Sequence, residues 1–372
     1  MTPLSIYIHM PFCRSRCFYC DFLTFDNQAH RINDYAKALK LDIINSGVDF
    51  VDYAVETVFF GGGTPSLLSL KQLGDILRTL QDNFALANDC HMSIEANPDT
   101  VDKDYLVGLR NLGFKRISFG VQSFEDDILR HIGRVHNGQT AQRVVGLAHE
   151  VGFEDISVDL IFALPHQTVD GLAKSLDIAT NLPITHISCY ALSVEEGTPL
   201  ATNKPLVDAI ASEEEDRAMY ALAKEKLAKS GFLHYEISNW ARPGYQCNHN
   251  LGYWTGREYL GLGLGASSYF NHKRLKKTQC LESYINGNFA FTYVEQIDKA
   301  TQMSEFVLLG LRLTEGISVI RFKNRFGKDI FEVYNKTLHQ FLAQGLLAQK
   351  DDKIALTPKG LDLSNAVFCE FL

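Results

Sequence analysis

Three cysteines near the start of the chain, Cys13, Cys17 and Cys20, have a spacing that suits metal binding. The pattern Cys-x3-Cys-x2-Cys places three thiolates on one short loop, directly after a β-type run. Three thiolates can hold three irons of a [4Fe–4S] cubane and leave the fourth iron without a protein ligand. A bidentate ligand, such as the amino and carboxylate groups of S-adenosylmethionine (SAM), can then bind that iron. The alternative is a zinc knuckle, whose fourth ligand would be His9 or a distant cysteine.

A glycine-rich turn, Gly61-Gly62-Gly63-Thr64-Pro65, follows the second β-type run. Glycines there let backbone N–H and C=O groups approach a ligand that a Cβ atom would exclude. The turn can therefore hold the ends of an amino acid, although a glycine turn alone is also an ordinary structural feature.

An aromatic stretch surrounds His249, with Tyr245, Tyr253 and Trp254 nearby in the sequence. Such rings can offer a flat apolar wall to a macrocycle, and an imidazole can ligate the macrocycle's iron. Cys247 is a second candidate ligand. The competing interpretation is a packed loop beside the mouth of the ligand site.

The elements that must position these residues alternate between β-type runs and segments with helical spacing. Strands are expected at Leu4–His9, Val55–Phe60, His91–Ala96, Arg116–Gly120, Ile156–Phe162 and His186–Ala191. This alternation predicts an α/β fold of right-handed βαβ units, forming a partial (β/α)6 TIM-like barrel. The ligand should lie at the carboxyl ends of the strands, where the cysteine loop and the glycine turn fall. Asp159 lies inside its strand, so the pattern does not fix its place at this mouth.

The pattern changes beyond the sixth strand. A long helix is expected at 208–231, followed by an irregular stretch rich in Gly, Asn and aromatic residues. Further helices are expected at Thr301–Leu313, Val319–Phe326 and Ile330–Gln344, then a hairpin turning at Asp351–Asp352 and a short helix from Lys359. Helices followed by a two-stranded wing predict a winged-helix-like domain. We therefore expect a core at 1–232, a barrel-closing segment with His249 at 233–299, and this small domain at 300–372.

The composition is that of a folded protein, with 46% hydrophobic and 22% charged residues. The net charge of −8 argues against nucleic acid as a partner. No stretch approaches the ~20 apolar residues of a membrane span, and the start lacks the features of a signal peptide, which predicts a cytoplasmic protein. In a reducing compartment, a tight group of cysteines indicates a metal site rather than disulfides.

The sequence resembles the radical SAM superfamily, whose signature is CX3CX2C. The longer run YIHMPFCRSRCFYCDF, together with GGGTPS, EANP, SFGVQSF, DLIFALP and HNLGYW, resembles the branch that contains the oxygen-independent coproporphyrinogen dehydrogenases and the HemW heme chaperones. The resemblance covers essentially the whole chain. It implies that Cys13, Cys17 and Cys20 bind one [4Fe–4S] cluster, which holds SAM.

The same resemblance implies which side chains contact SAM. Carboxylates and an amide suit ribose hydroxyls, and an arginine suits the SAM carboxylate through paired N–H donation. The glycine turn would contact the methionine amino group, and Tyr19 would pack near the adenine. The implied SAM-binding residues are Tyr7, Tyr19, Gly62, Gly63, Thr64, Glu95, Gln122, Arg134 and Asp159.

Two positions bear on the choice between the activities of this branch. HNxxYW looks like the motif linked with heme binding in HemW proteins, which makes His249 the implied heme ligand. The dehydrogenases carry a further cysteine two residues after the third cluster cysteine, and here that position is Phe22. We therefore expect a heme chaperone, with the cluster and SAM structural or regulatory. The alternative is a radical SAM dehydrogenase, which uses a 5′-deoxyadenosyl radical to abstract a hydrogen from a propionate of coproporphyrinogen III.

The expected partners are heme and apo-hemoproteins such as respiratory enzymes. A homodimer and a peripheral association with a membrane stay open. The basic run at 272–277, with Lys273, Arg274, Lys276 and Lys277, is expected to be a solvated turn; the alternative is a contact for heme propionates or for an acidic partner.

Overall fold

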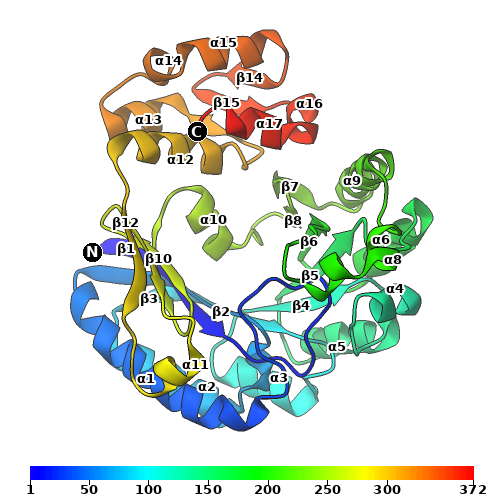
Figure 1. The fold of residues 1–372 in the computed structure, drawn as a ribbon, viewed down its shortest axis with the longest axis vertical. Coiled ribbons are helices and arrows are strands. Elements are labelled where there is room, and N and C mark those ends of the chain that lie inside the picture. Colours follow the sequence, from blue (N-terminus) through cyan, green and yellow to red (C-terminus); the bar gives the residue numbers. More distant parts are fainter.

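The six expected strands all form, and they pair side by side in chain order. In this computed structural model, which describes all 372 residues, these strands are mutually parallel. Their bounds are β1 Thr2–Met10, β2 Tyr53–Gly62, β3 Leu86–Ala96, β4 Arg116–Gln122, β5 Asp155–Phe162 and β6 His186–Ala191. The predicted α/β fold with an open, barrel-like parallel sheet is therefore confirmed (Figure 1).

Alternation along each strand separates an apolar outer face from a polar inner face. In β1, Leu4, Ile6 and Ile8 are fully buried in the main hydrophobic core. Tyr7 and His9, which alternate with Ile6 and Ile8, line an interior cavity instead. The same alternation in β3 and β5 turns Glu95 and Asp159 inward, into a second cavity. The barrel interior is therefore built from side chains that can bind polar ligands.

Helices cover the outer face of the parallel strands (Figure 1). Four of them begin at a Ser, Asp, Asn or Thr whose side chain accepts a backbone N–H of the first turn, namely Ser69, Asp102, Asn137 and Thr168. The bounds are α1 Ile32–Gly47, α2 Leu70–Asn83, α3 Lys103–Asn111, α4 Asp126–His131, α5 Gly138–Glu150 and α6 Val169–Asn181. The helix expected at 208–231 is α9 Glu213–Lys229, preceded by the short α7 Pro199–Thr202 and α8 Lys204–Val207.

Residues beyond 232 extend the sheet at both edges, which the sequence analysis did not predict. Two strands, β7 Leu233–Glu236 and β8 Asn239–Ala241, continue antiparallel from β6. At the other edge β9 Glu258–Leu262 pairs parallel with β1, and β10 Ser267–Phe270, β11 Lys273–Lys277 and β12 Phe291–Gln296 follow antiparallel. The sheet thus has twelve strands, and α10 Asn248–Trp254 lies at its open end, between the two edges (Figure 1).

The basic run at 272–277, which the sequence led us to expect as a solvated turn, is part of this sheet. It forms β11, and Lys277 is 1% exposed. The Lys277 ammonium pairs with the fully buried carboxylate of Asp42 on α1. Asp42 also accepts hydrogen bonds from the Tyr284 hydroxyl (2.8 Å) and the Gly263 N–H (3.0 Å). One buried carboxylate thus ties α1 to β11, to the loop after β9, and to α11 Leu281–Ile285.

The C-terminal residues form a small domain with a separate core of 15 buried hydrophobic residues. Its elements are α12 Lys299–Gly310, β13 Ile317–Ser318, α13 Val319–Phe326, α14 Ile330–Val333, α15 Asn335–Ala343, β14 Leu347–Lys350, β15 Lys353–Leu356, α16 Pro358–Asp362 and α17 Ser364–Cys369. The expected hairpin forms, and β13 adds a third strand beside β15. The helix expected at Ile330–Gln344 is broken at Tyr334. Across the whole fold, no helix has the length and apolar character needed to span a bilayer.

Candidate functional site

A cavity of about 420 Å³ lies at the carboxyl ends of the parallel strands, where the sequence predicted a ligand site. Eleven of the thirteen residues singled out from the sequence line it, including all three cysteines of the loop after β1. The remaining lining residues from that set are Tyr19, Gly62, Gly63, Thr64, Glu95, Gln122, Arg134 and Asp159. Tyr7 and His249 do not line this cavity.

Backbone hydrogen bonds within the loop fix the conformation of the cysteine segment. The Cys13 N–H donates to the Phe25 carbonyl (3.0 Å), and the Cys20 N–H donates to the Cys17 carbonyl (3.2 Å). No three His, Cys, Asp or Glu side chains converge closely enough to hold a single metal ion. The three cysteines line one common cavity.

Burial disfavours the charged form of two of these thiols, Cys13 and Cys20. Burial raises the pKa of Cys13 to about 11, against a hydrogen bond that the Thr64 hydroxyl donates to its sulfur (3.5 Å). Burial also raises the pKa of Cys20. Iron is bound by thiolates and not by thiols. Binding of a positively charged iron cluster would therefore release the thiol protons of these cysteines.

The glycine turn after β2 is shaped to leave room beside Cys13. Gly62 has φ +110°, and a Cβ there would lie 2.5 Å from the His9 ring. A Cβ at Gly63 would lie 2.7 Å from the Phe12 carbonyl oxygen and 3.0 Å from the Cys13 sulfur. A side chain at Gly63 would therefore fill the space next to the first cysteine, whereas a side chain at Gly62 would collide with the His9 ring, which explains the two glycines.

Arg134 connects the cysteine loop to the ends of β3 and β4. Its Nη1 donates to the Cys17 sulfur (3.3 Å), while Nη2 donates to the Asn97 side-chain oxygen (2.7 Å) and to the Gly120 carbonyl. Asn97 in turn donates to the Thr64 hydroxyl (3.0 Å). Asn97 belongs to the EANP segment and lies directly after a strand end, two residues from Glu95; this position is the signal in the sequence that could have identified it as a site residue.

Two carboxyl groups face one another across the cavity floor. Glu95 accepts the Gly62 N–H (3.1 Å), and Asp159 accepts the Ser118 hydroxyl at 3.1 and 3.2 Å. Burial, reinforced by the nearby Asp159, raises the pKa of Glu95 to about 8; burial also raises the pKa of Asp159. Glu95 is therefore largely protonated near neutral pH and can donate a hydrogen bond as well as accept one.

The backbone of Gln122, the last residue of β4, lies in the left-handed region with φ +69°. Residues other than glycine rarely adopt this conformation outside functional sites and turns. Gln122 lines the cavity together with the aromatic ring of Tyr19, which packs against Ile128, Leu129 and their neighbours. The cavity thus combines a polar floor with an aromatic and aliphatic wall, as a nucleoside-bearing ligand requires.

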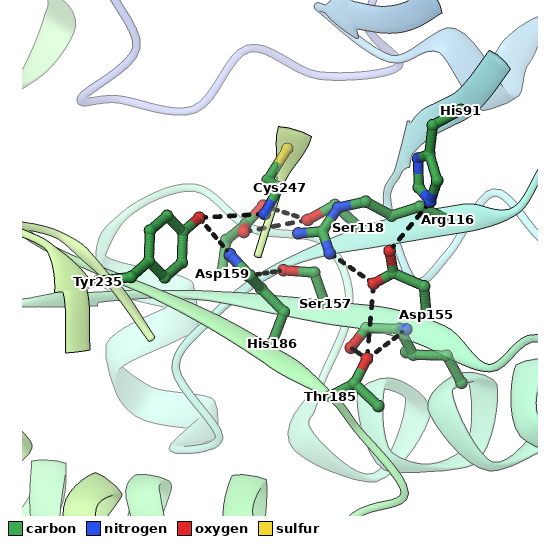
Figure 2. A network of polar contacts seen from close by, with 11 residues as sticks. His91, Arg116, Ser118, Asp155, Ser157, Asp159, Thr185, His186, Tyr235 and Cys247 are labelled. Carbon is green, nitrogen blue, oxygen red and sulfur yellow. Dashed lines mark hydrogen bonds and ion pairs between the residues drawn. The ribbon is translucent and has the colours of Figure 1, made fainter. Parts of the chain in front are cut away.

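A further polar network fills the barrel interior below Asp159 (Figure 2). Arg116 pairs with Asp155 at 2.6 Å, and the His91 ring lies 3.5 Å from the same carboxylate. On the opposite side Ser157 and Tyr235 bond the two nitrogens of His186, each at 2.8 Å. Because most of these groups bond one another, the network holds β4, β5, β6 and β7 together.

His249 lies against the middle of β2 and does not line the cavity of the cysteine loop. Its ring stacks on Phe59 at 5.0 Å between centroids, Nδ1 lies 2.8 Å from the Thr57 hydroxyl, and Nε2 lies 2.9 Å from the Tyr253 hydroxyl. The side chain is 3% exposed, and burial lowers its pKa to about 3. The imidazole is therefore neutral at physiological pH, but neither nitrogen is free in this conformation.

Tyr7 lies between these two regions. Its hydroxyl is 3.1 Å from His9 Nδ1, and its ring lines a neighbouring cavity that also contains Phe22 and Tyr253. Phe22, the residue that replaces a cysteine of the dehydrogenases, is 60% exposed at the rim.

Comparison with known proteins agrees with this architecture. A model of the radical SAM superfamily matches residues 7–179, and a model of the HemN C-terminal domain matches residues 297–363. The fold is similar to that of coproporphyrinogen III oxidase (HemN) from Escherichia coli, a radical SAM enzyme, with a TM-score of 0.89, 24% identity, and coverage of 100% of this chain and 90% of that one. The chain is thus a radical SAM protein with a HemN-type C-terminal domain.

Sequence similarity narrows the class further. The chain is 35% identical to the heme chaperone HemW of Bacillus subtilis (strain 168), over 99% of both chains. It is 33% identical to the heme chaperone HemW of Escherichia coli (strain K12), over 100% of this chain and 99% of that one. The chain belongs to the HemW family of heme chaperones.

Proposed function

We propose that this chain binds heme through His249 and delivers it to apo-hemoproteins such as respiratory enzymes. In this proposal Cys13, Cys17 and Cys20 carry a [4Fe–4S] cluster, and the cavity beside them holds SAM. Family membership supports the heme-handling role, and the residues of the cavity support binding of the cluster and SAM. A bound cluster supplies an iron with an open coordination position.

The residues of the cavity have distinct tasks in this proposal. Gly63 leaves room for the ligand beside Cys13 and Gly62 makes room for the His9 ring, while Thr64 and Arg134 hydrogen-bond the cysteine sulfurs of Cys13 and Cys17. Glu95 and Asp159 offer oxygens to hydroxyl groups, while Tyr19 provides an apolar face. These roles follow from the contacts in the cavity, all of which lie within one connected set of strand ends.

The observation that carries the heme assignment is the state of the His249 imidazole. A neutral imidazole is the form that ligates iron, and the bond to Thr57 fixes its orientation as a partner on the second nitrogen does in metal sites. Tyr253 occupies the other nitrogen. Heme binding then requires the Tyr253 hydroxyl to yield Nε2 to the iron.

Replacing His249 by alanine is expected to weaken hemin binding at least about tenfold, because the axial ligand is lost. Titrations followed at the Soret band measure this, with His149→Ala, an exposed histidine on α5, as the control for adventitious ligation. Tyr253→Phe should instead tighten binding about fivefold, since it removes a competing hydrogen bond worth about 1 kcal/mol. Unchanged hemin affinity in His249→Ala would show that another residue ligates the iron.

The alternative function is that of a radical SAM dehydrogenase acting on coproporphyrinogen III. The clustering of all three cysteines with eight of the nine implied SAM-binding residues favours it, because the same arrangement serves SAM cleavage. Phe22, in place of a cysteine, speaks against it.

A further inference from the structure

A third cavity, of about 300 Å³, lies between α10 and the C-terminal domain and shares no lining residue with the cavity of the cysteine loop. Tyr253 and Trp254 of the HNLGYW segment form one side of it, and Phe306 and Leu309 of α12 form the other. The cavity therefore joins the proposed heme-binding segment to a domain that has no part in the cavity lined by the cysteines.

Four arginines line this cavity, and only two of them form ion pairs with carboxylates. It is lined by Arg257, Arg274, Arg321 and Arg325, and by the carboxylates Glu305 and Glu315. Arg274 pairs with Glu295 and Glu305, Arg257 pairs with Glu56, and Glu315 pairs with Lys353. No carboxylate lies within ion-pair distance of Arg321 or Arg325.

The two unpaired arginines are well placed to act together. Arg321 and Arg325 are four residues apart on α13, so they project from the same face of the helix on successive turns. Arg325 approaches the loop after α10, where a Cβ on Gly256 would lie 3.0 Å from its guanidinium. The pair therefore presents two cations to the cavity from the C-terminal domain.

The opposite wall is aromatic and carries an unused hydrogen-bond donor. The Trp254 ring lies under the Arg312 guanidinium at 4.3 Å, which fixes the indole in place. Its Nε1–H is buried and has no partner. An unpartnered buried donor in a cavity that also contains two unpaired arginines favours a flat ligand that carries acceptors.

Tyr253 connects this cavity to His249. Its ring lines the cavity, its hydroxyl bonds His249 Nε2, and the two rings meet edge-to-face at 5.1 Å. A macrocycle whose iron replaces the Tyr253 hydroxyl at His249 would thus have its edge at this cavity.

We propose that the cavity between α10 and the C-terminal domain receives the carboxylate-bearing edge of a tetrapyrrole, with Arg321 and Arg325 binding its two carboxylates. This inference rests on the proposed heme-binding function and adds the second half of the site. Guanidinium groups bind carboxylates through paired N–H donors. The C-terminal domain is then a part of the heme site, and heme bridges it to α10.

The test compares hemin with hemin dimethyl ester, in which both carboxylates are blocked. Wild-type protein is titrated with each at the Soret band, alongside Arg321→Gln/Arg325→Gln and the control Lys323→Gln/Lys328→Gln. The control removes the same charge from exposed positions on and beside α13, outside the cavity. Thermal melting confirms that each variant is folded.

We expect the arginine variant to bind hemin about tenfold more weakly than wild type and the lysine variant to bind like wild type. Wild type should prefer hemin over its ester by a similar factor, and the arginine variant should not distinguish them. The inference is overturned if the arginine variant binds hemin as tightly as wild type, or if the variant prefers hemin over the ester as strongly as wild type does. Either result would leave the His249 assignment standing. Absence of hemin binding by wild type would instead contradict the proposed function itself.

Discussion

Replacement of Asp42 by alanine is expected to lower the free energy of unfolding by about 3–5 kcal/mol, because it leaves the buried Lys277 ammonium without a counter-ion. The Tyr284 hydroxyl and the Gly263 N–H lose their acceptor in the same change. Burial already lowers the pKa of Lys277, and Asp42 acts in the opposite direction. The deficit of the variant should therefore shrink as pH rises, since an unpaired Lys277 can lose its proton.

Thermal and denaturant unfolding measure this effect, with Asp34→Ala as the matched control. Asp34 lies on the same helix in an exposed ion pair with Lys37 and should contribute less than about 1 kcal/mol. The double variant Asp42→Leu/Lys277→Met should recover most of the loss, because an apolar pair needs no compensation. A small and equal effect of Asp42→Ala and Asp34→Ala would contradict the role of this ion pair.

The second large effect concerns Glu95, whose pKa in the folded protein is about 8, against an ordinary value of 4.5. Between these values the unfolded chain has lost the proton that the folded chain retains, so stability falls as pH rises. Each pH unit in this window costs the wild type up to about 1.4 kcal/mol. The side chain in Glu95→Gln cannot ionise, so this variant should escape the loss. The free energy of unfolding of Glu95→Gln, relative to that of wild type, should therefore grow from pH 5 to pH 8 and then level off.

Melting temperatures of the SAM-free protein from pH 5 to pH 9 check this expectation. Glu154→Gln, which alters an exposed carboxylate, is the control. The difference between Glu95→Gln and wild type must increase with pH; a difference that is constant or that decreases would show that Glu95 is ionised in the folded protein.

The core of the fold follows from local signals in the sequence. The six parallel strands are short, hydrophobic on one face, and bounded by turns, and helices such as α2 and α6 begin at Ser69 and Thr168, which cap them. The strand ends then gather the cysteine loop, the glycine turn and the polar residues after β3 and β4, because parallel strands share one carboxyl edge. These parts of the site could be predicted for that reason.

The parts that could not be predicted depend on contacts between distant residues. β9 pairs with β1 although the two strands are distant in the sequence, and β8 and β10 have only three and four residues. The sequence alone would place Lys277 at the surface, because its buried partner Asp42 is distant in the sequence. The placement of α10 has the same origin: nothing local to HNLGYW shows that His249 packs against Phe59 and Thr57, away from the cysteines.

His249 does not line the cavity of the cysteines, so heme at His249 and SAM beside the cysteines would contact different residues. A dehydrogenase needs its porphyrinogen substrate beside SAM, in the cavity of Cys13 and Glu95. A chaperone has no such requirement, and its heme can lie near α10 and the C-terminal domain.

The most direct test is therefore an anaerobic incubation of the reconstituted protein with coproporphyrinogen III, SAM and a reductant, with the porphyrinogen products quantified by chromatography. The proposed heme chaperone should form no protoporphyrinogen beyond a control that lacks SAM, while the same preparation binds hemin through His249. Repeated turnover to protoporphyrinogen would contradict the account and identify the chain as a dehydrogenase.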